Sequence, residues 1–124
     1  MTWTIWIVIG SILGGLSVAL GAFGAHALRQ RLSAENLLIF DIGARYQMYH
    51  ALALLAVGLL SVKVDHPALN VAGCAFVVGV VLFSGSLYVL SMSESRFWGM
   101  VTPVGGFAFL IGWAALTVAV VKTL

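Results

Sequence analysis

Four long apolar runs, separated by short polar turns, constrain the fold of this sequence most strongly. A helix that crosses a bilayer needs about 20 mostly apolar residues, and runs of this kind cover residues 3–28, 44–62, 67–90 and 103–122. Only 8% of the 124 residues are charged and 62% are hydrophobic, so the chain has too few charges to cover a globular domain with a hydrated surface. The sequence therefore predicts an all-α, integral membrane four-helix bundle with short connections, in a single membrane domain over residues 1–124.

Local signals set the ends of the predicted spans. Pro67 suits the first position of a helix after a polar turn, and Thr102 followed by Pro103 suits the start of the fourth span. The stretch SAENLLIFDIG before the second span mixes acidic and apolar residues, which is typical of a short helix in the membrane interface. We expect Ser33 to cap this interfacial helix and Gly43 to let it bend into the span.

Small residues recur at spacings of three and four along three of the predicted spans. They are Gly10, Gly14, Ser17 and Gly21 in the first span, Ala44, Ala51 and Gly58 in the second, and Gly105, Ala108, Gly112, Ala115 and Ala119 in the fourth. Lipid tails are as apolar as leucine, so helices in a membrane associate through close van der Waals contact and hydrogen bonds. These small-residue seams therefore predict a tightly packed bundle.

Polar side chains concentrate in one half of the predicted bundle, because four alternating spans bring the corresponding helix ends to the same side. The residues that share this half are His26, Arg45, Tyr46, Gln47, Tyr49, His50, Ser84, Ser86, Tyr88 and Thr102. At about 100° per residue, Gln47 and His50 point toward the small-residue seam of the second span, whereas Arg45 and Tyr49 lie on its opposite face. We predict one connected polar site of His26, Gln47 and His50, with Ser84, Ser86 or Tyr88 contributed by the third span. Asp41 lies four residues before Arg45 and can pair with it if the helix is continuous.

The polar cluster has two interpretations at this point. Polar side chains are costly inside a membrane and are common at functional sites. Tyrosines are also ordinary interface anchors, and a hydrogen bond from histidine to glutamine or serine can simply hold helices together. A chain of such groups can relay protons, but the polar track stops halfway across the bundle, so a complete path would need an oligomer.

Four strings in the sequence, GAFGAHAL, RYQMYHALAL, LFSGSLY and TPVGGFAFLIGW, carry a family resemblance. In order and spacing the chain resembles the small membrane proteins catalogued as domain of unknown function 423, which include vertebrate transmembrane protein 256. The resemblance covers nearly the whole chain. It implies a four-span integral membrane protein without an established activity, and it supplies no catalytic assignment. His26, Arg45, Tyr46, Gln47 and His50 lie in its most recognisable strings.

Few chemistries fit the polar residues. Two histidines on adjacent spans could hold a haem, but tightly packed glycine helices leave little room for one. His66 is expected on the opposite side, so the zinc-ligand set is incomplete. Ser84 or Ser86 with His50 would be a nucleophile and its base, yet no carboxylate is placed to orient the histidine. We therefore expect no catalytic residues, no metal and no cofactor, and a protein that is not an enzyme.

The sequence favours a structural or interaction role in the lipid bilayer, as a bundle that packs with itself or with a larger membrane complex. The alternative is an oligomeric transporter or channel-like protein that uses a polar half-channel at His26 and His50. A net charge of +2 is too small to predict nucleic-acid binding.

Charge placement predicts the orientation, since Lys and Arg near short loops favour the cytoplasm. The cations on one side are Arg29, Arg31, Arg45 and Arg96, against Lys63 and Lys122 on the other. Both termini are expected to face away from the cytoplasm, in the plasma (inner) membrane if the chain is bacterial.

Overall fold

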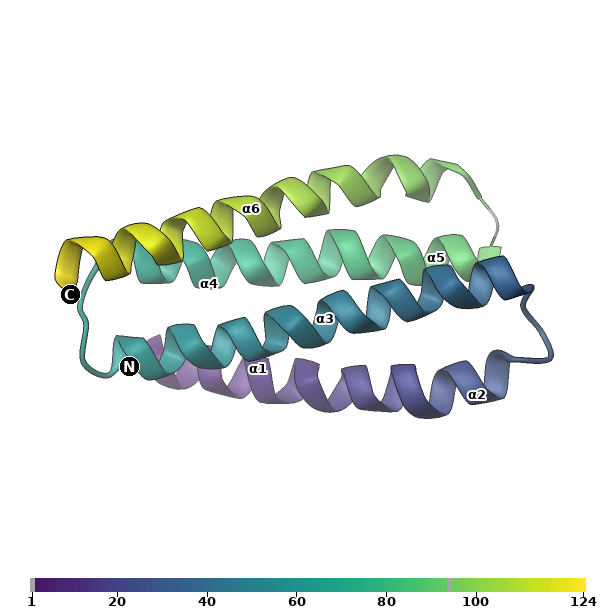
Figure 1. Cartoon of the computed structure of the whole chain (residues 1–124), viewed down its shortest axis with the longest axis horizontal. Coiled ribbons are helices and arrows are strands. Elements are labelled where there is room, and N and C mark those ends of the chain that lie inside the picture. Colours follow the sequence, from purple (N-terminus) through teal and green to yellow (C-terminus); the bar gives the residue numbers. More distant parts are fainter. Residues whose placement is uncertain (1, 94) are drawn as a thin grey trace.

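The chain forms four long helical segments joined by short connections, and each segment runs antiparallel to the one before it (Figure 1). The computed structural model describes residues 2–93 and 95–124, and within these ranges every regular element is helical. The first segment consists of α1 (Thr2–Val18), a π-helical turn η1 (Ala19–Gly24) and α2 (Ala25–Leu28), and the second is α3 (Ala34–Ser61). The third segment consists of α4 (Pro67–Gly79), a second π-helical turn η2 (Val80–Ser84) and α5 (Gly85–Ser93). The fourth segment is α6 (Phe97–Thr123). Both termini lie at the same end of the molecule.

Three of the described segments are long and apolar enough to cross a membrane, namely Thr4–Leu28, Pro67–Ser93 and Phe97–Thr123. The all-helical prediction and three of the four predicted spans agree with this result. The helix α3 has 28 residues but is not in this group, because Arg45, Gln47 and His50 lower the mean hydropathy of even its most apolar stretch.

The predicted interfacial helix is not a separate element. Ser33 does cap a helix, since its Oγ accepts a hydrogen bond from the backbone N–H of Asn36 at 3.1 Å. The helix that begins there continues through Gly43 without a break, so the expected bend is wrong. Gly43 instead lets α5 approach, because a Cβ at this position would lie 2.9 Å from Cε1 of Tyr88.

The start predicted for the fourth span is also wrong. The helix α6 begins at Phe97, so Pro103 lies inside it. The Thr102 hydroxyl donates a hydrogen bond to the carbonyl of Trp98 at 3.2 Å, next to the turn in which Pro103 lacks an N–H. Membrane helices tolerate such prolines because hydroxyl side chains and neighbouring helices compensate locally.

The start of the third segment agrees with the sequence. Pro67 occupies the first turn of α4, and Nδ1 of His66 accepts a hydrogen bond from the N–H of Ala68 at 3.1 Å.

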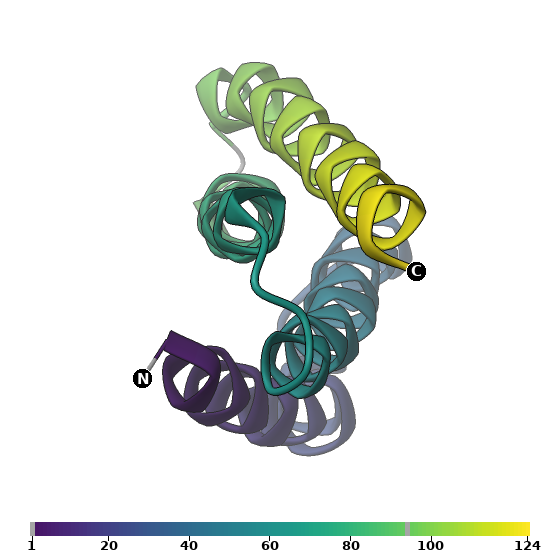
Figure 2. The ribbon, with the colours of Figure 1, turned by 90° about the vertical axis from the view of Figure 1, so that its left-hand side faces the viewer.

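The bundle is built from two antiparallel pairs (Figure 2). The helix α1 packs along α3, and α4 packs along α6, while α3 joins the pairs through contacts with α4, η2 and α5. The small-residue seams lie at these contacts. A Cβ on Gly10 would lie 2.8 Å from the Ala51 carbonyl oxygen, and one on Gly112 would lie 2.5 Å from Cε1 of Phe76. Helices approach this closely only where side chains are absent, which confirms the seams as packing surfaces.

Candidate functional site

Gln47, on α3, connects three helices through hydrogen bonds. Its Nε2 donates to the Leu13 carbonyl of α1 at 2.9 Å, and its Oε1 accepts from the Tyr88 hydroxyl of α5 at 2.6 Å. The side chain is buried, with 3% of its surface exposed. Its amide donor and its amide oxygen are both paired, so Gln47 is well suited to hold α1, α3 and α5 together.

His50 lies one turn further along α3 and faces α6. Its Nδ1 is 2.7 Å from the Tyr46 carbonyl oxygen, and its Nε2 is 3.0 Å from Nε1 of Trp113. The imidazole also stacks on Phe109, with ring centroids 3.5 Å apart and an interplanar angle of 6°. His50 therefore fastens α3 to α6 through both hydrogen bonding and ring stacking.

These two hydrogen bonds define the protonation of the His50 ring. A carbonyl oxygen only accepts, so Nδ1 must carry the hydrogen; an indole N–H only donates, so Nε2 must be the acceptor. The geometry thus specifies a neutral imidazole protonated at Nδ1. Both ring nitrogens are engaged, which leaves neither of them available to exchange a proton with a serine or a second histidine in this arrangement.

The structure does not bring His26 to this position. His26 is exposed in α2, on the outer face of the first segment. Gly24 lies against Phe40, which is ten residues, or about 15 Å, before His50 along α3. His26 lies two residues beyond Gly24 in the antiparallel first segment, so it is still farther from the level of His50. The predicted connected site of His26, Gln47 and His50 is therefore divided.

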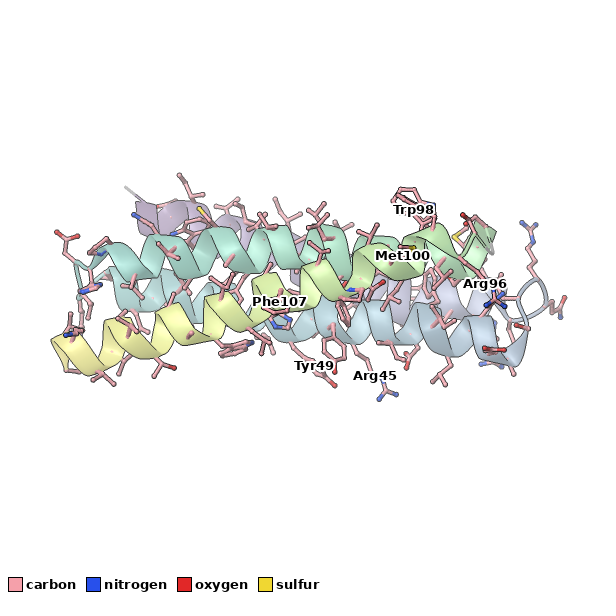
Figure 3. The ribbon with its side chains drawn as sticks, turned by 90° about the horizontal axis from the view of Figure 1, so that it is seen from above. Arg45, Tyr49, Arg96, Trp98, Met100 and Phe107 are labelled. Carbon is pink, nitrogen blue, oxygen red and sulfur yellow. The ribbon has the colours of Figure 1, made fainter. Side chains whose placement is uncertain are left out.

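The remaining predicted residues occupy separate environments. The Ser86 hydroxyl lies 2.6 Å from the Thr102 hydroxyl, which links α5 to α6. Because Thr102 donates its hydrogen to the Trp98 carbonyl, Ser86 is the donor of this pair. Ser84 is buried, and its hydroxyl has no hydrogen-bond partner among the described residues. Arg45 pairs with Asp41, with Nε and Oδ2 2.7 Å apart, as expected for a continuous helix. Tyr49 is exposed, and Figure 3 shows it with Arg45 pointing outward from α3.

An outward-facing groove of about 620 Å³ lies between α3 and α6, beside His50. Its lining is almost entirely apolar and aromatic, and consists of Tyr46, Tyr49, His50, Phe83, Pro103, Gly106, Phe107, Phe109, Leu110 and Trp113. We call it the α3/α6 groove. It contrasts with the close helix contacts at Gly10, between α1 and α3, and at Gly112, between α4 and α6.

Sequence reasoning missed Trp113 and Phe109. Tryptophans in membrane proteins concentrate at the two interfaces, whereas Trp113 lies well inside α6, among apolar residues. A tryptophan in that position needs an acceptor for its N–H, and this signal could have directed attention to a partner on a neighbouring helix.

Long apolar helices, close glycine contacts and extensive exposed apolar surface define the class of this chain as a helical membrane protein. A model of the family described as "Protein of unknown function (DUF423)" matches residues 20–106. The chain belongs to this family, which confirms the resemblance carried by the four sequence strings.

Relatives of similar length support the same assignment. The chain is 43% identical over 121 residues to the UPF0382 membrane protein YwdK of Bacillus subtilis (strain 168), a match that covers 97% of this chain and 98% of the relative. It is 38% identical over 122 residues to the UPF0382 inner membrane protein YgdD of Escherichia coli (strain K12), which covers 98% of this chain and 93% of the relative. No solved structure matches the chain.

Proposed function

We propose that this chain is a four-span integral membrane protein with a structural or interaction role, and that its α3/α6 groove receives an apolar helix. That helix belongs to a second copy of the chain or to a larger membrane complex. The observation that carries the proposal is the groove itself, a ring-lined, outward-facing hollow on the α3/α6 side of the bundle.

The proposal includes α3 as the fourth span. Its 28 residues extend over about 42 Å, more than the ~30 Å of a bilayer core. The polar residues that would lie deepest, Gln47 and His50, are buried and hydrogen-bonded to neighbouring helices. Polar groups that face the bundle interior are the kind a membrane span accommodates.

The shape and lining of the α3/α6 groove suit a helix. Membrane helices associate where small residues and complementary surfaces allow close contact. Gly106 lies in the groove, and Phe107 and Leu110 on its α6 side are largely exposed. An apolar helix seated there would cover side chains that the isolated chain leaves open.

The hydrogen bonds of the polar residues support a non-catalytic role. His50 is bonded through both ring nitrogens, and the Ser86 hydroxyl donates to the Thr102 hydroxyl. No described residue bonds the Ser84 hydroxyl. A nucleophile needs an adjacent base, and the observed pairs do not form such an arrangement. The alternative transporter role draws no support from the separated positions of His26 and His50.

A variant that fills the groove tests the proposed association. Gly106→Leu places a branched side chain in the α3/α6 groove, and it should abolish an oligomer or a stoichiometric complex that the unaltered protein shows by native mass measurement in mild detergent. The matched control is Ala114→Leu, because Ala114 is exposed on α6 outside the groove. A purely monomeric unaltered protein would contradict the proposal, as would equal losses in the two variants.

Topology is tested by labelling single cysteines in the full-length chain, with Cys74 replaced by alanine. We expect an impermeant thiol reagent to label Asp65→Cys from the non-cytoplasmic side of intact cells and to leave Gln30→Cys unlabelled. Four crossings and an excess of Arg near the Gln30 connection give this result. Labelling of both positions from one side would mean that α3 does not cross, and the reverse pattern would place the termini in the cytoplasm.

A further inference from the structure

A second groove, of about 320 Å³, lies between the first helical segment and α3, away from the α3/α6 groove. It is lined by Ser17, Val18, Gly21, Ala22, Asp41, Ala44, Arg45 and Met48. We call it the α1/α3 groove. It combines an ion pair at one end, small residues along its length and a buried hydroxyl.

The Ser17 hydroxyl lacks a hydrogen-bond partner among the described residues, although only 4% of the residue is exposed. A serine in a helix commonly bonds the carbonyl four residues earlier, which here belongs to Leu13. That carbonyl instead accepts the amide of Gln47 at 2.9 Å. Buried hydroxyls are nearly always paired, and this one lines an open groove, so a ligand with an acceptor can satisfy it there.

The Asp41–Arg45 pair presents both signs of charge at the mouth of the groove. The two side chains are 33% and 65% exposed, and the contact uses Nε of Arg45 and Oδ2 of Asp41. The terminal guanidinium nitrogens of Arg45 make no other hydrogen bond within the described residues, so they can donate to a phosphate. The carboxylate of Asp41 can accept from an ammonium group at the same time.

Depth places this pair at the level of lipid headgroups. If ~30 Å of α3 spans the bilayer core, about eight of its residues extend beyond it, and Asp41 is the eighth residue of the helix. Gly21 lies level with Ala44, since a Cβ on Gly21 would be 3.5 Å from that of Ala44. Ser17 lies one helical turn, or about 6 Å, deeper in the bilayer than Gly21. The distance from the phosphate to the ester carbonyl across the glycerol unit of a phospholipid is similar.

We infer that the α1/α3 groove binds a phospholipid with a zwitterionic phosphoethanolamine headgroup. Arg45 takes the phosphate, Asp41 takes the ammonium, and the Ser17 hydroxyl donates to an ester carbonyl. Gly21 and Ala22 leave space for the start of an acyl chain. The inference rests on the proposed crossing by α3, which the cysteine labelling reports separately, and it does not depend on association through the α3/α6 groove.

Native mass spectrometry of the full-length chain in detergent, with added lipids of identical acyl chains, tests the headgroup. Phosphatidylethanolamine should be retained about tenfold more than phosphatidylglycerol or phosphatidylcholine, the factor typical of one hydrogen bond to a charged group. Asp41→Asn should remove this preference. Equal retention of the three lipids, or an unchanged preference in Asp41→Asn, would overturn the inference.

Variants along the groove test the position of the lipid. Ala22→Leu should lower retention of phosphatidylethanolamine, whereas Ala19→Leu, on the same π-helical turn but outside the groove, should not. Gly106→Leu should also leave it unchanged, which separates this result from the association test. Equal losses in Ala22→Leu and Ala19→Leu would contradict a lipid in this groove.

The Ser17 bond has its own test, because replacing an unpaired hydroxyl leaves the fold intact. Ser17→Ala should weaken retention of ester-linked phosphatidylethanolamine and leave the weaker retention of its ether-linked analogue unchanged; Ser11→Ala, at an exposed position, is the control. Soluble phosphoethanolamine should not displace the lipid at equal concentration. Displacement at equal concentration would show that the site recognises only the headgroup, and an ester preference that persists in Ser17→Ala would remove Ser17 from the site.

Discussion

Gly105→Ala is expected to destabilise the bundle by about 3 kcal/mol, at the upper end of the range for overpacking. A Cβ at this position would overlap the backbone nitrogen and Cα of Phe83 in η2. Backbone atoms cannot rotate away as the end of a side chain can, so the helices α6 and η2 must move apart. Reversible unfolding of the purified protein in mixed detergent micelles, followed by circular dichroism, measures the loss.

The neighbouring glycine supplies the control for this prediction. A Cβ on Gly106 would meet its nearest atom, Cδ2 of Phe83, at 3.9 Å, an ordinary contact. Gly106→Ala should therefore be neutral or stabilising by up to about 1 kcal/mol, from its higher helix propensity. Equal destabilisation by the two alanines would mean that the close contact between α6 and Phe83 is not a constraint on the fold.

Gln47→Leu is expected to cost about 2 kcal/mol, because it removes two hydrogen bonds and leaves the Tyr88 hydroxyl without its acceptor. Single hydrogen bonds between membrane helices contribute about 0.6 kcal/mol on average. The larger expected loss comes from breaking the contacts of α3 with both α1 and α5 in one substitution. The same unfolding measurement applies.

Tyr88→Phe separates the two contributions to this loss. It removes the hydroxyl that donates a hydrogen bond to Gln47. It retains the aromatic ring, whose centroid lies 5.0 Å from that of Phe40. The double variant should be more stable than the sum of the single changes predicts, by about 1 kcal/mol, as expected for two residues in direct contact. Strict additivity would show that the Gln47–Tyr88 hydrogen bond contributes nothing to stability.

Much of the fold could be predicted because its determinants are local in sequence. Apolar runs locate the helices, and the spacing of Gly105 and Gly112 identifies a packed face. Gly43 and Pro103 were misjudged for a common reason. Glycine and proline often end or bend helices. A glycine also permits the close approach of a neighbouring helix, and a membrane helix can accommodate the N–H that a proline lacks. Which effect applies at Gly43 and Pro103 depends on the neighbouring helices.

The candidate site was harder to predict because it depends on how helices align. The second span was expected to start at Ala44, which would place His26 near His50. The helix α3 begins ten residues earlier, so its first turns pair with the end of the first segment and leave His50 deeper in the bundle. Trp113 was missed because the rotation of α6 about its axis, relative to α3, is not encoded in either helix alone.

Hydroxyl side chains also made the sequence look more polar than the structure is. Several of them donate to backbone carbonyls of their own helices, namely the hydroxyls of Ser61, Ser91, Ser93, Thr102, Thr117 and Thr123. A hydroxyl that is satisfied within its own turn adds little polarity to the surface that a neighbouring helix meets.

The modest apolar character of α3 has a consequence for biogenesis. Among the described residues, the first helical segment, the α4–α5 segment and α6 are long and apolar enough to cross a membrane. Gln47 and His50 become tolerable in the bilayer only when Leu13, Tyr88 and Trp113 supply their hydrogen bonds. On the proposed crossing by α3, we expect this helix to enter the lipid late, after the first segment and the two following helices have emerged from the translocon. Insertion of α3 and assembly of the bundle would then be a single event.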